Sequence, residues 1–350
     1  MPNAYISGTG FYVPPRRVTN DDLRTQYGID TTHEWILQRT GIEERRFADE
    51  GVGSAELGTK AAEAAIAKAG IQKTDLDMII FATLSPEHCF PGSGVYLQNK
   101  LGLCEGPNAK FVPALDVRNQ CSGFLYSLGT ATSMVKSGAC KHVLVVGAEV
   151  HSAALDLSTR GRGVASLFGD GAGAVIVSAT DEDRGVRTWK LGADGRFADV
   201  LAQKVWDIKK RPFIPVNAEG VGQVQPEMLW AQMDGKLVFK NAVERMITVL
   251  IGGLHERGLH GQRHRPVRLP PGEQAHQRVH REEPRHPGRE ARPQHRALRK
   301  HDGRHDPDPP RGGGSERPIE ARDEGRVRRV RLRVHLGLGD HRLVIAVTAH

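Results

Sequence analysis

Cys121 lies at a change of composition in the segment RNQCSGFLYSLG, residues 118–129. An extended polar stretch ends there and a run of small and apolar residues begins, so we expect a helix over residues 121–137 with Cys121 in its first turn. Unpaired backbone N–H groups and the positive end of the helix dipole meet at such a position, and both lower the pKa of a thiol. Cys121 is therefore a candidate nucleophile for an acyl group. The alternative is a small buried hydrophobic residue, a common role of free cysteine.

The other three cysteines, Cys89, Cys104 and Cys140, are sparse and irregularly spaced, with no C-x-x-C pattern. Neither a disulfide framework nor a zinc site is indicated, and we expect reduced thiols and no metal. The first residues lack a basic start followed by an apolar run, and no window reaches the roughly 18 apolar residues of a membrane span. These features predict a cytoplasmic protein that is not embedded in a membrane.

The net charge of +8 is confined to one end of the chain. Residues 1–254 hold 27 Lys and Arg against 28 Asp and Glu, whereas residues 255–350 hold 22 against 13. A basic protein surface that binds nucleic acid is therefore not indicated for the first part of the chain.

Residues 1–254 have the pattern of an α/β protein. Three continuous apolar runs, at residues 76–85, 141–150 and 171–179, predict strands, and residues 54–70 predict a helix. Continuous apolar character indicates strands that are buried on both faces. A sheet layered between helices satisfies that requirement.

Residues 255–350 have a different composition, rich in Arg, Pro, His and Gly and without a helical or strand period. This composition predicts a poorly ordered segment without a packed core. It contains 21 Arg and one Lys, against 14 Arg and 13 Lys before it, which is typical of GC-rich DNA translated out of frame. The competing interpretation is a disordered basic tail that binds nucleic acid.

Four segments of the first part resemble the β-ketoacyl-acyl carrier protein synthase III family of the thiolase superfamily. The segment DVRNQCSGFLYSL resembles the family's nucleophile segment. The other three resemble its opening strand, its coenzyme A segment and the end of its first half: YISGTGFYVPPRRVTNDDL, EWILQRTGIEERRFA and LFGDGAGAVIV. The resemblance covers roughly residues 1–254, and the motifs occur in the family's order.

The resemblance implies a layered αβαβα thiolase-like fold. Residues 1–175 would form its first half with the nucleophile, residues 176–254 would begin the second half, and residues 255–350 would leave that half incomplete. It also implies a two-step acyl transfer. Cys121 would take an acyl group from acyl-coenzyme A, and malonyl-acyl carrier protein would then lose carbon dioxide and attack the thioester. Coenzyme A enters as part of a substrate, and no cofactor is expected.

The same resemblance implies roles for five further residues. Trp35 and Arg39 would sandwich the adenine of coenzyme A, Arg160 would hold its phosphates, and Thr31 is a weaker candidate beside them. Phe90 would cross the interface of a homodimer and shape the acyl pocket of the partner. Without the resemblance, Trp35 is more often a core residue, and the arginines are solvated surface charges. For Phe90, ordinary core packing is as good an interpretation as the role at the dimer interface.

The family's second half supplies a histidine, an asparagine and a glycine turn, and none of their motifs occurs in this chain. Moving the reading frame forward by one base over residues 269–274 permits Phe-His-Gln-Ala-Asn-Lys. Over residues 298–306 it permits Tyr-Gly-Asn-Thr-Thr-Ala-Ala-Thr-Ile, and over residues 324–337 it permits a strand with Gly-Ser-Gly-Phe. The three motifs lie in order and share one offset. We therefore expect the partners of Cys121 to be encoded out of frame from about residues 250–256, and the chain as written to be inactive in condensation.

Three other functions stay open at the level of sequence. A related condensing enzyme of secondary metabolism would share the nucleophile and differ in the shape of its pocket. A non-catalytic protein could dimerise through the intact first part. A basic-tailed nucleic-acid binder would lose affinity steeply with salt.

Overall fold

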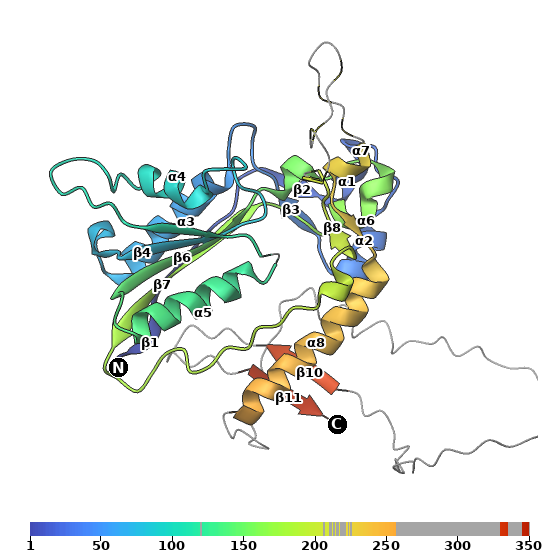
Figure 1. Ribbon diagram of the computed structural model, residues 1–350. Coiled ribbons are helices and arrows are strands. Elements are labelled where there is room, and N and C mark those ends of the chain that lie inside the picture. The colour runs from blue at the N-terminus through green and yellow to red at the C-terminus, as the bar shows by residue number, and fades with distance from the viewer. Residues whose placement is uncertain are drawn as a thin grey trace, which may run out of the picture.

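A five-stranded sheet lies at the centre of the molecule (Figure 1). The computed structural model describes residues 1–119, 121–205 and 226–256, the strands at 330–334 and 345–349, and isolated positions between 207 and 224. The order of the strands across the sheet is β1 (Asn3–Tyr12), β7 (Gly171–Thr180), β6 (His142–Glu149), β4 (Met78–Ala82) and β5 (Ala114–Val117).

The sheet is mixed. Strands β6, β4 and β5 run parallel to one another, whereas β7 is antiparallel to both β6 and β1. The carboxyl ends of the three parallel strands therefore meet at one edge of the sheet. In open α/β sheets, ligand sites form beyond this edge.

Helices cover both faces of the sheet. The helices α3 (Ser54–Ala69) and α4 (Ser93–Lys100) lie on one face, and α5 (Gly123–Lys136) lies on the other (Figure 1). Along β6, Leu144 and Val146 are buried in the core with α3, while Val143 and Val145 are buried in the core with α5. Alternate side chains thus enter different cores, which explains the continuous apolar runs in the sequence.

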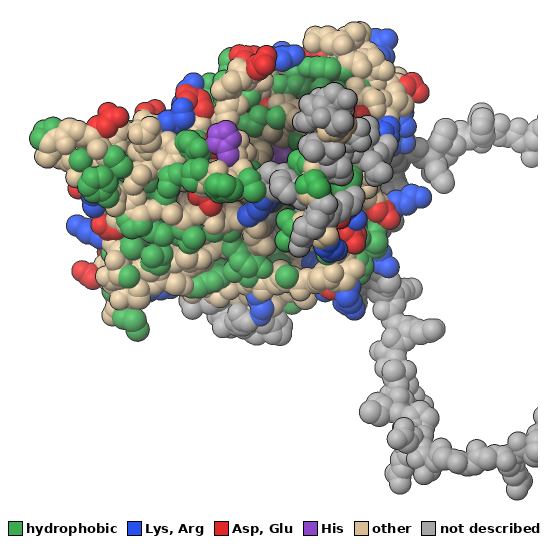
Figure 2. Space-filling view, turned by 45° about the horizontal axis from the view of Figure 1, so that its top comes forward, with side chains coloured by type: hydrophobic (Ala, Val, Ile, Leu, Met, Phe, Trp, Pro, Cys, Tyr) green, Lys and Arg blue, Asp and Glu red, His purple; other side chains and the backbone are tan. Residues whose placement is uncertain are grey.

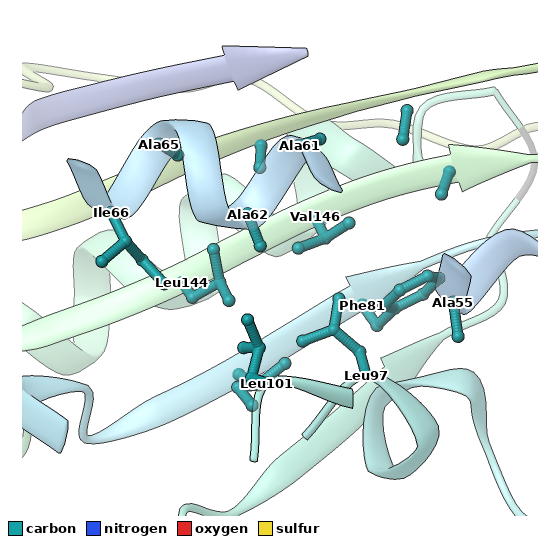
Figure 3. Close-up of a cluster of buried hydrophobic side chains, with 14 of the residues drawn as sticks. Ala55, Ala61, Ala62, Ala65, Ile66, Phe81, Leu97, Leu101, Leu144 and Val146 are labelled. Carbon is teal, nitrogen blue, oxygen red and sulfur yellow. The ribbon is translucent and has the colours of Figure 1, made fainter. Parts of the chain in front are cut away.

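The helix α3 packs against the sheet at very short range. Ala62 lies beside Leu144 and Val146 of β6, as Figure 3 shows. At β1, a Cβ atom added to Gly8 would lie 2.2 Å from the Ala65 carbonyl oxygen, and one added to Gly10 would lie 2.1 Å from the Ala61 carbonyl oxygen. Small residues on both elements therefore allow a backbone-to-backbone approach that larger side chains would prevent.

A second body of short elements packs beside the sheet around its own apolar cluster, which includes Leu23, Ile36, Phe47 and Val164. Its strands and helices are β2 (Arg17–Thr19), α1 (Asn20–Thr25), α2 (His33–Thr40), β3 (Glu44–Arg46), the short helices η2 (His151–Ala154) and η3 (Thr159–Gly161), and α6 (Arg162–Ala165). The remaining elements are η1 (Lys73–Asp75), η4 (Gly195–Phe197), β8 (Leu201–Ala202), α7 (Pro226–Leu229), β9 (Gln232–Met233), α8 (Gly235–Glu256), β10 (Val330–Val334) and β11 (Ile345–Ala349).

The predicted α/β class and the three predicted strands are confirmed, and the helix predicted at 54–70 is α3. The helix predicted over 121–137 begins two residues later, at Gly123, because Cys121 and Ser122 form a turn. This corrects the placement of Cys121 in a first helical turn.

The described residues hold the first αβα half of the predicted five-layered fold. No second large sheet occurs in that part of the chain, and no side chain described in α8 is buried. An incomplete second half agrees with both observations. The proposed boundary between residues 175 and 176 falls inside β7. The proposed poorly ordered segment 255–350 lies mostly outside the described residues, where only the antiparallel pair β10 and β11 is described after α8.

Candidate active site

The loops that follow β4, β5 and β6 meet at the carboxyl edge of the parallel strands. The segment 118–122 joins β5 to α5 and carries Cys121. The first turn of α5 lies against the end of β4, since a Cβ atom added to Gly123 would lie 3.4 Å from the Ala82 Cβ atom. The fold therefore presents Cys121 at the edge where α/β proteins place their ligands.

Cys121 is exposed and immediately precedes Ser122, the N-cap residue of α5. The Ser122 side chain makes no capping hydrogen bond, and no acidic residue occupies the first turn. The positive end of the 14-residue helix is therefore not neutralised by a capping side chain or a carboxylate of its own first turn. A helix N-terminus of this kind favours an oxyanion that forms beside it, as acyl transfer to a cysteine requires.

The remaining cysteines differ in exposure. Cys89 is exposed in the loop after β4, and Cys104 is partly exposed. Cys140 is 9% exposed, and burial raises the pKa of its thiol, with a further rise from the nearby Asp77 carboxylate. A buried thiol with a raised pKa is a poor nucleophile. All four cysteines are unpaired.

The Trp35 ring, on α2, is flanked by two guanidinium groups. The Cζ atom of Arg39 lies 4.2 Å from the ring centroid, and the Cζ atom of Arg162 lies 4.4 Å from it. Arg162 is held in place by a 2.6 Å hydrogen bond from its Nη1 atom to the Asp30 carbonyl oxygen. Two planar cations and an indole at this range make a surface suited to a planar, anionic ligand.

Arg160, the phosphate-binding candidate from the sequence, interacts with a carboxylate. Its Nε atom donates to Asp156 Oδ2 over 2.7 Å. Arg162, two residues further along in the segment STRGRG, is the arginine that contacts Trp35, and the sequence analysis missed it. The only available signal was the second arginine in that segment, because η3 and α6 are too short to show a helical period that assigns directions to side chains.

Thr31 directly follows Asp30, whose carbonyl oxygen accepts the hydrogen bond from Arg162, and it is 5% exposed. Its hydroxyl oxygen is buried and has no hydrogen-bond partner among the described residues. An unpaired buried hydroxyl is unfavourable by about 1–3 kcal/mol. Thr31 therefore fits a site in which a ligand oxygen or a water completes the hydrogen bonding.

Phe90 is 83% exposed, so it is not a core residue in this chain. It belongs to the loop between β4 and α4, whose start is fixed by the Glu149 carboxylate at the end of β6. That carboxylate accepts hydrogen bonds from Leu84 N at 2.9 Å and from Ser85 Oγ at 2.6 Å. An exposed aromatic side chain on an anchored loop is typical of a contact surface.

The structure brings Trp35, Arg39 and Arg162 together, and it places Cys121 on a separate element. Two segments proposed to encode the partners of Cys121 in another frame, 269–274 and 298–306, lie outside the described residues, and only part of 324–337 is described, as β10. Among the described side chains, no cluster of three or more His, Cys, Asp or Glu could hold a metal ion. No helix in the described part of the chain has the length and apolar character that crossing a membrane requires.

Comparison with known proteins identifies relatives of the chain. The sequence profile of the 3-Oxoacyl-[acyl-carrier-protein (ACP)] synthase III family matches residues 115–195, which run from β5 through α5 and β6 to beyond β7. The solved 3-oxoacyl-[acyl-carrier-protein] synthase III of Aquifex aeolicus VF5 is 36% identical, with a TM-score of 0.60, over 73% of this chain and 72% of that one.

Two further solved structures are similar to a comparable degree. The synthase III of Thermus thermophilus is 34% identical, with a TM-score of 0.60, over 73% of this chain and 72% of that one. The synthase III of Pseudomonas aeruginosa PAO1 is 31% identical, with a TM-score of 0.61, over 73% of this chain and 71% of that one.

Proposed function

Because the chain belongs to the 3-oxoacyl-[acyl-carrier-protein] synthase III family, we propose that it derives from an acyltransferase that starts fatty-acid synthesis by decarboxylative condensation. The observation that carries this proposal is the position of Cys121, exposed at the N-terminus of α5 in the part of the chain that matches the family profile. The alternatives, an enzyme of secondary metabolism, a non-catalytic dimer or a nucleic-acid binder, are not favoured by these relatives.

In the first step, the Cys121 thiolate attacks the carbonyl carbon of acyl-coenzyme A. The carbonyl oxygen becomes an oxyanion next to the uncapped first turn of α5, where N–H groups favour negative charge. The carbon–sulfur bond to coenzyme A then breaks, coenzyme A leaves as its thiolate, and the acyl group stays on Cys121 as a thioester.

In the second step, malonyl-acyl carrier protein loses carbon dioxide, and the electron pair of the broken bond forms an enolate. The enolate carbon attacks the acyl thioester, and the Cys121 thiolate is released with the 3-oxoacyl product. Hydrogen-bond donors must stabilise the enolate where its charge develops. The donors implied by the family are not encoded in this reading frame, so we propose that the chain as written stops at the acyl-enzyme.

For coenzyme A, we propose a subsite made by Trp35, Arg39 and Arg162, with Thr31, whose buried hydroxyl is unpaired, as a further contributor. The indole offers a stacking face to adenine, and the guanidinium groups offer charge to the phosphates. Arg160 would act at the rim of this subsite, because its guanidinium is engaged by Asp156.

We also propose that the chain forms a homodimer through the β5 edge of the sheet. β5 pairs only with β4 in the described sheet, so its outer edge is unpaired there. Large apolar side chains are exposed around it: Phe90, Val95, Phe111 and Leu115. Hydrophobic side chains gather on the same side of the molecule as α4 (Figures 1 and 2). An exposed edge strand with apolar neighbours favours pairing with another chain.

A test of the first step uses the chain with acetyl-coenzyme A and intact-protein mass spectrometry. We expect a mass increase of one acyl group, which Cys121→Ala abolishes. Cys89→Ala is the matched control, because Cys89 is also exposed, and it should retain the adduct. An acyl adduct that persists in Cys121→Ala would assign the nucleophile to another residue.

The unpaired thiols fit a reducing compartment, and we propose that the protein acts in the cytoplasm.

A further inference from the structure

Two helices next to the Phe90 loop begin without a cap of their own. The N-cap residues of α3 and α4 are Gly53 and Gly92, and neither has a side chain that could accept a hydrogen bond. Carboxylates from other segments take that place. Glu87 accepts a hydrogen bond from Ala55 N in the first turn of α3, and Asp116 accepts hydrogen bonds from two N–H groups at the start of α4.

The glycines make room for these carboxylates. A Cβ atom added to Gly53 would lie 2.7 Å from Glu87 Oε1, and one added to Gly92 would lie 2.3 Å from the Asp116 Cγ atom. An ordinary N-cap residue would therefore collide with the carboxylate that replaces it. Helix capping by a residue from another segment ties that segment to the helix, which local capping does not do.

Glu87 reaches both helices. Its Oε2 atom accepts a 2.5 Å hydrogen bond from Ser93 Oγ in α4, and its Oε1 atom accepts a 3.2 Å hydrogen bond from Ser54 Oγ in α3. Asp116, in contrast, contacts only the start of α4 among the described hydrogen bonds. Glu87 is thus the point at which the loop between β4 and α4 is fastened to two helices at once.

We propose that Glu87 is a positioning residue that fixes the loop backbone from which Phe90 projects toward a second copy of this chain. Phe90 lies three residues after Glu87 and is 83% exposed, so contacts within the chain do not fix its side chain, and the place of the ring depends on the loop backbone. Fastening the loop at Glu87 removes backbone freedom that the loop would otherwise lose on association. A pre-ordered loop lowers this entropic cost, and an aromatic side chain on it therefore binds more tightly. This inference rests on the homodimer of the proposed function.

The test uses the full chain and measures the dimer dissociation constant by sedimentation. Glu87→Ala should raise that constant about tenfold, similar to Phe90→Ala. Glu87→Gln retains an oxygen that can accept the bond from Ala55 N, so it should stay within about threefold of the unmodified chain. The matched control is Glu63→Ala, which removes an exposed carboxylate from α3 itself and should leave the constant unchanged.

Hydrogen exchange of the peptide covering residues 84–92 gives a second readout that needs no dimer. Exchange should become faster in Glu87→Ala and in Ser93→Ala. Ser93→Ala removes the hydrogen bond between Glu87 and α4 and leaves the bond from Ala55 N at the start of α3 in place. Unchanged exchange in both variants would overturn the proposal. The proposal would also be overturned if Phe90→Ala raised the dimer dissociation constant and Glu87→Ala left it unchanged. A monomeric unmodified chain would count against the proposed homodimer, and the exchange experiment alone would then decide the role of Glu87.

Discussion

The Cζ atom of Arg162 lies 4.4 Å from the centroid of the Trp35 ring. The guanidinium therefore occupies the space in which a flat ligand between the two groups would have to bind. Stacked groups sit about 3.5–4 Å apart, so an adenine between them needs roughly twice the observed separation. The hydrogen bond from Arg162 to the Asp30 carbonyl oxygen must therefore give way before an adenine can lie between the two groups. Arg162 is close enough to Trp35 to act on a ligand that binds there.

The affinity for coenzyme A should depend on Arg162 more than on Arg160. Arg162→Ala removes a cation next to the stacking ring, and contacts of this kind contribute about 0.5–2 kcal/mol, so we expect an increase in Kd of about tenfold. Arg160→Ala removes a cation that Asp156 already engages and should change Kd by less than about threefold. Isothermal titration calorimetry with coenzyme A measures both. A larger increase in Kd from Arg160→Ala than from Arg162→Ala would indicate that Arg160 binds the phosphates.

Reactivity toward iodoacetamide should separate the cysteines by their surroundings. Cys121 is exposed beside a helix N-terminus, whereas Cys140 is 9% exposed and burial raises the pKa of its thiol. We expect Cys121 to be alkylated at least about ten times faster at neutral pH. Peptide mass spectrometry after timed labelling gives the two rates. Equal rates would show that the environment described for Cys121 does not activate or expose its sulfur.

The close packing of α3 on β1 predicts a large effect of one methyl group. Gly10→Ala would place a Cβ atom 2.1 Å from the Ala61 carbonyl oxygen, and we expect a loss of about 1–3 kcal/mol in the free energy of unfolding. Gly173→Ala is the control, because it adds the same group to the neighbouring strand with no atom within 4 Å. Denaturant titration compares the two variants. Equal stability of both would refute the described approach of helix and strand.

Asp116 should make the stability of the chain depend on pH in an unusual direction. Burial, with repulsion from Glu87, raises the pKa of Asp116 above its ordinary value despite the hydrogen bonds from Gly94 N and Ser93 N. The folded state then holds the proton more tightly than the unfolded state does. Asp116 therefore contributes to the free energy of unfolding. This contribution is fully present below the pKa of the carboxyl in the unfolded chain, about 3.9, and it is lost as the pH rises through the higher pKa in the folded chain.

Asp116→Asn removes that titration while an oxygen remains to cap α4. The free energy of unfolding of the unmodified chain minus that of Asp116→Asn should therefore fall as the pH rises through the folded pKa. Chemical denaturation at a series of pH values measures this difference. A difference that grows with pH would mean that the native environment favours the carboxylate.

The strands that are buried on both faces of the sheet could be predicted from the sequence. Residues 141–150 alternate between two cores, and that burial requires the continuous apolar run from which the strand was predicted. The start of α5 was misplaced by two residues because Cys121 and Ser122 form a turn that the helical pattern does not mark. Arg162 and Glu87 were missed for a related reason. Their contacts join segments that are distant in sequence, and no local spacing predicts which of several similar side chains reaches across.

We propose that Cys121 belongs to a condensing enzyme whose other catalytic groups are encoded in a different frame after about residue 250. The most direct measurement is the formation of 3-oxoacyl product from acetyl-coenzyme A and malonyl-acyl carrier protein. The 350-residue chain should give none, because the loss of even one transition-state donor costs about 10²–10³ in rate and several are absent. A gene with the frame restored across codons 245–260 should give product, and Cys121→Ala in that restored protein should abolish it. Robust condensation by the 350-residue chain, or none by the restored protein, would contradict the account.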